Sequence, residues 1–185
     1  IHDLFEGETG VDLNRAGTAL IEIVTDPDLR SPEEAQAYLR EIRKMVRYLD
    51  ICDGNMEEGS LRCDANISVR KIGSTEYGQR VEVKNMNSIR HVMKAIEYEA
   101  TRQIDEIEAG NAIAQETRSF NATDHSTFAL RSKEDSMDYR YFPEPDLIPI
   151  HVSDEDIEAI KKAMPELPRE SIPRLMETYG LSMYD

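Results

Sequence analysis

The chain has 185 residues, of which 39% are hydrophobic and 32% charged, and it carries a formal net charge of −15 at pH 7. This length allows one sizeable core, while the acidic balance argues against general electrostatic clamping of nucleic acid. No apolar run approaches the ~20 residues of a membrane span and no signal peptide is visible, so we expect a soluble, cytoplasmic protein with no membrane partner. The two cysteines have no metal-ligand spacing, which makes a disulfide framework or a zinc site unlikely.

The first fifty residues predict one strand and one helix. Residues 1–17 are rich in Gly and Asp and are expected to be irregular. Residues 18–25, TALIEIVT, predict a buried strand whose one charge is Glu22. A buried carboxylate needs a partner, so pairing with an Arg such as Arg15 and a functional role both stay open. The SPEE sequence at 31–34 is a capping box that predicts a packing helix reaching about Asp50.

The most informative stretch is 55–87. Its two-residue alternation predicts a hairpin with one apolar face and one polar face, and the polar face carries Arg62, Asp64, Asn66, Glu82 and Lys84. Short carboxylates fixed on a strand pair suit Mg²⁺, which prefers oxygen ligands and leaves positions for water and phosphate. The alternative interpretation is an ordinary solvated hairpin face.

The local charge favours the metal interpretation. Between Ser60 and Lys94 seven Lys and Arg residues stand against three Asp and Glu residues, a local balance of +4 in an acidic chain. A positive region with carboxylates inside it is what a metal and polyphosphate site requires.

A long helix is expected next, capped by Ser88 and stopped by Gly110. Its outer face is expected to be a charged surface exposed to solvent, made of Glu97, Glu99, Arg102, Asp105, Glu106 and Glu108. Strands are then expected at 115–121 and 127–131.

Residues 131–146 combine charge, proline and aromatic side chains, which predicts an ordered loop. The basic residues Arg131, Lys133 and Arg140 are candidates for phosphate contacts, and the aromatic rings are candidates for stacking on a base. A Pro-rigid loop pinned by its aromatics is the alternative. A short strand at 147–152, a helix at 153–164 and a further helix to about 180 complete the prediction.

Several long motifs carry a family resemblance that covers essentially the whole chain: LNRAGTALIEIVTDPDLRS, GNMEEGSLRCDANISVR, VEVKNMNS and RSKEDSMDYRYFPEPDLIP. The chain resembles the GatB family of aspartyl/glutamyl-tRNA amidotransferase subunits. The resemblance implies an α+β fold, in which an antiparallel sheet with flanking helices forms a cradle like that of glutamine synthetase and guanidino kinases. This partial catalytic domain would span 1–152, and a helical domain would start within 153–185.

The same resemblance implies a function. The family uses ATP to phosphorylate the side-chain carboxylate of Glu misacylated on tRNA-Gln, or of Asp on tRNA-Asn. Ammonia from a partner glutaminase then displaces the phosphate, which makes the complex a ligase of protein biosynthesis. The implied partners are the amidase GatA, the small protein GatC and misacylated tRNA, which the family grips with C-terminal domains beyond this segment.

Residue roles follow by resemblance, with ATP and Mg²⁺ as the cofactors. The expected metal ligands are Asp64 and Glu82, with Glu58 nearby and Glu22 supplementary. The expected catalytic residues are Arg62, Lys84 and Asn66. Arg62 and Lys84 would face the phosphates or the substrate carboxylate. Phosphate or substrate contacts are expected from Arg131, Lys133, Arg140 and Asn85.

One departure from the family pattern leaves alternatives open. The family carries further acidic and His ligands in an HMEED-like segment that would lie before Ile1, so we expect a partial chain with a half-built site and little kinase activity alone. The alternatives are a non-catalytic scaffold for the amidase or tRNA, and a relative of the archaeal-type GatE proteins, which are selective for Glu-tRNA-Gln. The upstream sequence of the gene would discriminate between the enzyme and the scaffold.

Overall fold

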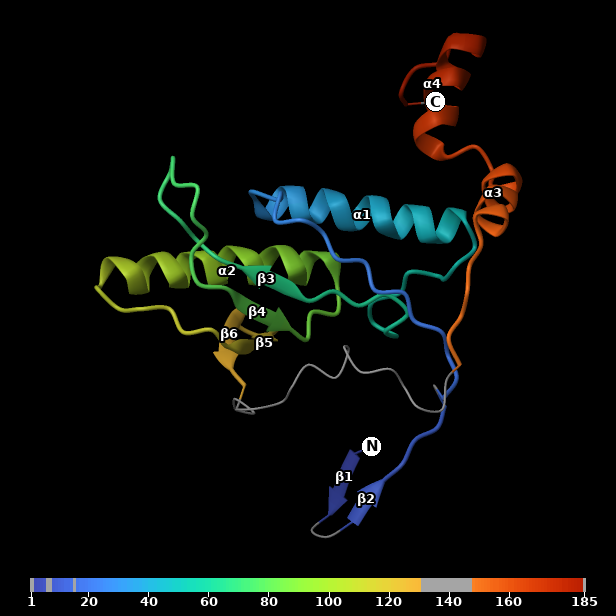
Figure 1. Cartoon of the computed structure of the whole chain (residues 1–185). Helices are drawn as coiled ribbons and strands as arrows, with labels where there is room; N and C mark the ends of the chain where they lie inside the picture. The colour runs from blue at the N-terminus through green and yellow to red at the C-terminus, as the bar shows by residue number, and fades with distance from the viewer. Residues whose placement is uncertain (1, 6–7, 15, 131–147, 185) are drawn as a thin grey trace.

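The structure is a computed structural model that describes residues 2–5, 8–14, 16–130 and 148–184 (Figure 1). The fold is α+β. Its elements in chain order are β1 (His2–Phe5), β2 (Glu8–Gly10), α1 (Pro32–Tyr48), β3 (Ala65–Ile67), β4 (Val81–Lys84), α2 (Ile89–Glu108), β5 (Thr117–Asn121), β6 (Ser126–Ala129), α3 (Asp154–Ala163) and α4 (Pro168–Tyr179). Within these ranges, no helix is both long and apolar enough to cross a membrane.

The main sheet has the strand order β3-β4-β5-β6. The outer pairs, β3 with β4 and β5 with β6, are antiparallel, whereas β4 and β5 run parallel. The prediction of an antiparallel sheet is therefore wrong for the central pair. The reason is α2, which carries the chain back along the sheet so that β5 starts at the same end as β4, as in a β-α-β unit.

Both long helices begin and end where local chemistry predicts. Ser31 caps α1 by accepting a hydrogen bond from the Glu34 backbone N–H, and a proline occupies the first helical position. The Ser88 hydroxyl caps α2 in the same way, accepting from the His91 N–H at 3.1 Å. Gly110, at φ +85°, follows the end of α2 in the left-handed conformation that glycine adopts without strain.

The core lies between the main sheet and the two long helices, which Figure 1 shows side by side on one side of the sheet. Its buried side chains come from α1, α2, three strands and the loops beside them, and they are Leu39, Met56, Ile67, Val83, Met86, Val92, Ala95 and Phe120. The alternation along β4 leaves Val81 and Val83 with no exposed surface. Glu82 and Lys84 must therefore point to the opposite, polar face of the sheet.

Three predictions for the ends of the domain are wrong. Residues 18–25 form no strand, and Leu20, Ile21, Ile23 and Val24 are 57% to 80% exposed. An apolar run becomes a strand only when a neighbouring strand pairs its backbone, and in the described part of the chain no strand pairs with this segment. Residues expected to be irregular instead form the antiparallel β1 and β2 pair, and residues 148–152 contain no strand.

The two C-terminal helices follow the prediction. A capping box starts α3, because the Ser153 hydroxyl accepts from the Asp156 N–H while the Asp156 carboxylate accepts from the Ser153 N–H. Gly180, at φ +66°, ends α4. Tyr48 at the end of α1 donates a hydrogen bond of 2.8 Å to the Glu166 carbonyl, which joins the segment between α3 and α4 to the sheet domain.

Candidate functional site

The candidate site is the polar face of β3 and β4. In their antiparallel register Asn66 lies opposite Glu82, and Ala65 lies opposite Val83. Asp64 directly precedes β3 and lies within ion-pair distance of Lys84 on the neighbouring strand. The predicted hairpin with a buried apolar face and an exposed polar face is confirmed by this register and by the burial of Val81 and Val83.

Lys84 lies between the two carboxylates. Its Nζ is 3.3 Å from Asp64 Oδ2 and 3.4 Å from Glu82 Oε2, and all three side chains are one third to one half exposed. Burial lowers the pKa of Lys84, but the charges and hydrogen bonds of Asp64 and Glu82 raise it more, so its net pKa lies above the ordinary value. The site thus places two carboxyl groups around one ammonium group that they help to keep protonated.

Strand β5 adds two hydroxyl groups to this face. Its parallel register places Thr117 beside Glu82 and Ser119 beside Lys84. Thr117 Oγ1 donates a hydrogen bond of 3.0 Å to Glu82 Oε2. The alternation of 115–121 separates these hydroxyls from Arg118. Nothing in the sequence indicates that β5 pairs with β4, so the sequence alone does not assign the hydroxyls to the site.

Asn85 directly follows β4 with a left-handed φ of +65°, a conformation that Asn tolerates better than most residues. Its Nδ2 donates a hydrogen bond of 2.7 Å to Ser119 Oγ. In this structure the amide that was expected to contact phosphate thus ties the end of β4 to β5.

The other predicted residues are not among the ion-pair partners of Lys84, or they lie outside the described residues. Arg62 is exposed in the segment before β3, Glu58 is exposed in a turn and Glu22 is exposed in the extended segment before α1. Neither glutamate is one of the carboxylates that pair with Lys84. Among the residues that the structure describes, no three His, Cys, Asp or Glu side chains come together as a group able to hold a metal ion. The loop residues expected to contact phosphate, Arg131, Lys133 and Arg140, lie outside the described residues.

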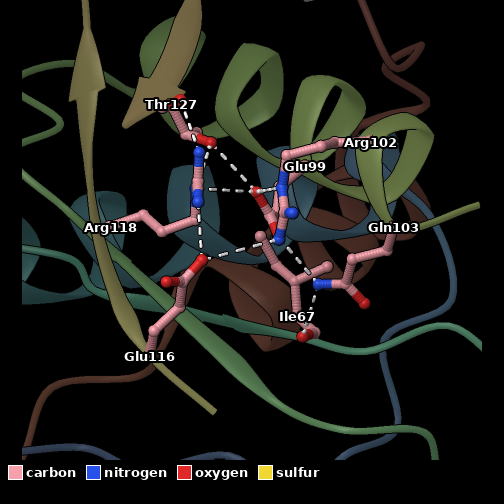
Figure 2. A network of polar contacts seen from close by, with 7 residues as sticks. All are labelled: Ile67, Glu99, Arg102, Gln103, Glu116, Arg118 and Thr127. Carbon is pink, nitrogen blue, oxygen red and sulfur yellow. Dashed lines mark hydrogen bonds and ion pairs between the residues drawn. The ribbon is translucent and has the colours of Figure 1, made fainter. Parts of the chain in front are cut away.

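A buried polar network supports the sheet from behind (Figure 2). The prediction that Glu99 belongs to a solvated face is wrong, because its side chain is fully buried. Its carboxylate accepts hydrogen bonds from Arg102 at 2.7 and 3.0 Å, from Gln103 at 2.9 Å and from Thr127 at 2.9 Å. Arg118 on β5 lies 3.5 Å from the same carboxylate. Burial raises the pKa of Glu99, but the hydrogen bonds together lower it by more, so the net pKa is below the ordinary value.

The network joins α2 to three strands. Gln103 donates to the Ile67 carbonyl of β3 at 3.2 Å. Arg118 of β5 donates to Thr127 of β6 and to Glu116 at 2.6 to 2.8 Å. Thr117 and Ser119 flank Arg118 on β5. The network therefore holds β5 through Arg118 on the buried face, while the two hydroxyls bond Glu82 and Asn85 on the polar face.

Comparison with known proteins identifies the family. A family model for the GatB/GatE catalytic domain matches residues 1–158. The chain belongs to this family. It is 56% identical over 185 residues to the GatB subunit of the aspartyl/glutamyl-tRNA(Asn/Gln) amidotransferase of Thermodesulfovibrio yellowstonii, a match covering 100% of this chain and 39% of that protein.

The GatB subunits of the same amidotransferase from Halorhodospira halophila and Paramagnetospirillum magneticum are 54% and 55% identical over the whole chain, which covers 39% and 38% of their lengths. The chain of this GatB/GatE family member thus spans about two fifths of the length of the curated relatives it matches.

Proposed function

We propose that this chain carries part of the centre that phosphorylates, with ATP, the side-chain carboxylate of Glu or Asp misacylated on tRNA. The observation that supports this most is the convergence of Asp64 and Glu82 on the ammonium of Lys84, on a sheet face away from the core. The relatives are named for the amidation of tRNA(Asn/Gln), a reaction that needs an activated carboxylate. The activated acyl phosphate would then react with ammonia supplied by a partner glutaminase.

The side chains of the polar face fit a magnesium ion. Two carboxylates converge on one cation, and the Asn66 amide lies opposite Glu82 in the register. Mg²⁺ in nucleotide sites is held by one or two carboxylates together with substrate phosphates and water, so no third protein carboxylate is required. Asp64 and Glu82 would hold the ion, with Glu58 and Glu22 as supplementary ligands. When bound, the ion would neutralise charge on the transferring phosphoryl group.

The chain's own residues would supply positioning and positive charge. The substrate carboxylate is ionised at neutral pH, so its attack on the γ-phosphorus of ATP needs no general base. A new carboxylate-oxygen–phosphorus bond forms as the bond between the γ-phosphorus and its bridging oxygen breaks, releasing ADP. Lys84, kept protonated by its two neighbours, and Arg62 would neutralise the crowded oxygens, while Asn66 would orient them.

The remaining roles are proposed by family membership. Asn85, Arg131, Lys133 and Arg140 would contact phosphate or the substrate carboxylate. The 1–152 segment would belong to a cradle like that of glutamine synthetase, and the helices after Ser153 would begin a helical domain. The amidase GatA, the small protein GatC and tRNA would be its partners in the complete enzyme.

The test is the substitution Asp64→Asn in the complete amidotransferase. It keeps the size of the side chain and removes one of the two charges beside Lys84. We expect transfer of the ATP γ-phosphate to misacylated tRNA to fall by at least about 100-fold, or roughly 2.7 kcal/mol of transition-state stabilisation. Glutamine hydrolysis by the partner glutaminase should continue at its basal rate. Asp105→Asn on α2, an exposed Asp outside the site, is the matched control and should leave both rates unchanged.

Normal phosphoryl transfer in the Asp64→Asn enzyme would contradict the proposed site. Loss of both activities together with a lower melting temperature would show that Asp64 supports folding and not phosphoryl transfer.

A further inference from the structure

A groove of about 800 Å³ is lined by residues that do not belong to the candidate site. Its walls come from the C-terminal half of α1, the turn at 55–57, the start of α2 and Pro168. The α1 wall carries four basic side chains, Arg40, Arg43, Lys44 and Arg47, against one acidic lining residue, Glu57. The lining thus has a charge of +3 in a chain whose net charge is −15.

In the described part of the chain, these cations have few close acidic partners. Within the described ranges, Arg40, Arg43 and Arg47 make no ion pair within 4.0 Å, and Lys44 reaches Glu41 only at that limit. Asp53, a carboxylate near Arg43 and Arg47, is held by the Asn55 backbone N–H at 2.8 Å. All four basic residues are exposed.

The four cations form a continuous row. Positions i, i+3, i+4 and i+7 share one face of a helix, and like charges at this spacing destabilise it. At about 1.5 Å per residue the row from Arg40 to Arg47 is about 10 Å long. The start of α2 extends the positive region, because Ser88 and Ile89 line the groove and the first turn of α2 contains no acidic residue. Such an arrangement favours an extended anion over a single phosphate.

We propose that this groove binds the sugar–phosphate backbone of the tRNA substrate. This inference rests on the proposed function, which makes tRNA the substrate. Phosphates along one strand of double-helical DNA advance by roughly 3.4 Å, and on that scale a row of about 10 Å spans about three phosphates of a nucleic-acid backbone. Arginine binds phosphate bidentately, and three of the four cations are arginines. The groove contacts the body of the RNA, whereas the polar face acts on the aminoacyl end.

The experiment measures tRNA affinity in the complete amidotransferase at several salt concentrations, without ATP. Arg43→Gln combined with Arg47→Gln should weaken binding by at least about tenfold and reduce the salt slope of log K by about 1.4 to 1.8, the contribution of two phosphates. Replacement of both residues by Lys keeps the charges and should preserve the salt slope. The matched control is Lys71→Gln with Arg80→Gln, two exposed cations of the connection between β3 and β4, which projects beyond the other end of α1 (Figure 1).

Three outcomes would overturn the proposal. An equal loss in the control would show a general field effect, and an equal loss in the Lys variant would show that packing and not phosphate charge is involved. A higher KM for ATP with unchanged tRNA affinity would assign the groove to a nucleotide. Because binding is measured without phosphoryl transfer, a failure of the proposed kinase activity would not change the tRNA result.

Discussion

Lys84 is the residue whose position carries most of the chemistry of the site. Without it, Asp64 and Glu82 would present two negative charges to one another across neighbouring strands. The ammonium relieves that repulsion, and the carboxylates in turn hold it protonated. If the two carboxylates hold a metal ion as proposed, Lys84 would compete with that ion for them and would have to move toward the substrate phosphates.

Lys84→Met in the complete enzyme separates the competition of Lys84 with a metal ion from its contact with the substrate phosphates. The substitution keeps an unbranched side chain and removes the charge, so we expect Mg²⁺ or Mn²⁺ to bind at least as tightly as in the wild type. Phosphoryl transfer should nevertheless fall by about 100-fold or more, because the positive charge facing the phosphates is lost. Titration calorimetry with the metal and a single-turnover phosphorylation assay measure the two effects. Weaker metal binding would show instead that Lys84 only orders the two carboxylates.

At the scale of elements, the Glu99 network decides how firmly the strands of the site are held. Glu99→Ala leaves Arg102 and Arg118 without their shared buried carboxylate, and we expect a loss of about 3–5 kcal/mol in the free energy of unfolding. Glu97→Ala on the same helix removes an ion pair with Lys94 in which both side chains are about one third exposed, and it should cost less than about 1 kcal/mol. Denaturant unfolding of the two variants makes the comparison, and equal losses would contradict the role of the network.

The depressed pKa of Glu99 also predicts a pH dependence. A carboxylate with a lower pKa in the folded state contributes stability above its unfolded value, near 4.5, and loses that contribution as the pH falls through the folded pKa. Wild-type stability should therefore decline in acid, below about pH 4.5. Glu99→Gln should show a shallower decline over the same range, and an unchanged slope would contradict the assignment.

Local sequence signals are sufficient to predict the elements whose structure depends on residues nearby in the chain. Ser88 and Gly110 delimit α2, and the alternation around Asp64 and Glu82 defines the polar face. The local sequence gives no sign that Glu99 is buried, because its burial depends on Arg118 and Thr127, which reach it from strands 19 or more residues later in the chain. The 18–25 segment was assigned to a strand because its composition favours one, but composition does not specify a pairing partner.

At the scale of the whole molecule, positive charge is concentrated at one groove of an otherwise acidic chain. The chain is strongly acidic, yet the groove on α1 is lined by four cations and one carboxylate. Non-specific binding of nucleic acid depends on the summed phosphate contacts. The few contacts that this groove offers would therefore contribute affinity only together with the other surfaces of a complete enzyme.

The isolated 185-residue chain should accordingly show no measurable tRNA binding at physiological salt. The reason is that the net charge of −15 repels the RNA more than one groove attracts it. A filter-binding or anisotropy titration tests this prediction. Micromolar or tighter binding by the isolated chain would contradict it.

The central claim, that Asp64 and Glu82 hold the metal of a phosphoryl-transfer site, is tested most directly by anomalous diffraction. Crystals of the complete amidotransferase would be grown with Mn²⁺ and a non-hydrolysable ATP analogue. We predict a manganese peak about 2.1 Å from a carboxylate oxygen of each residue, next to the nucleotide phosphates, with the Lys84 ammonium moved from between the carboxylates toward those phosphates. A nucleotide and metal bound elsewhere, with Lys84 still paired to both carboxylates, would contradict the account.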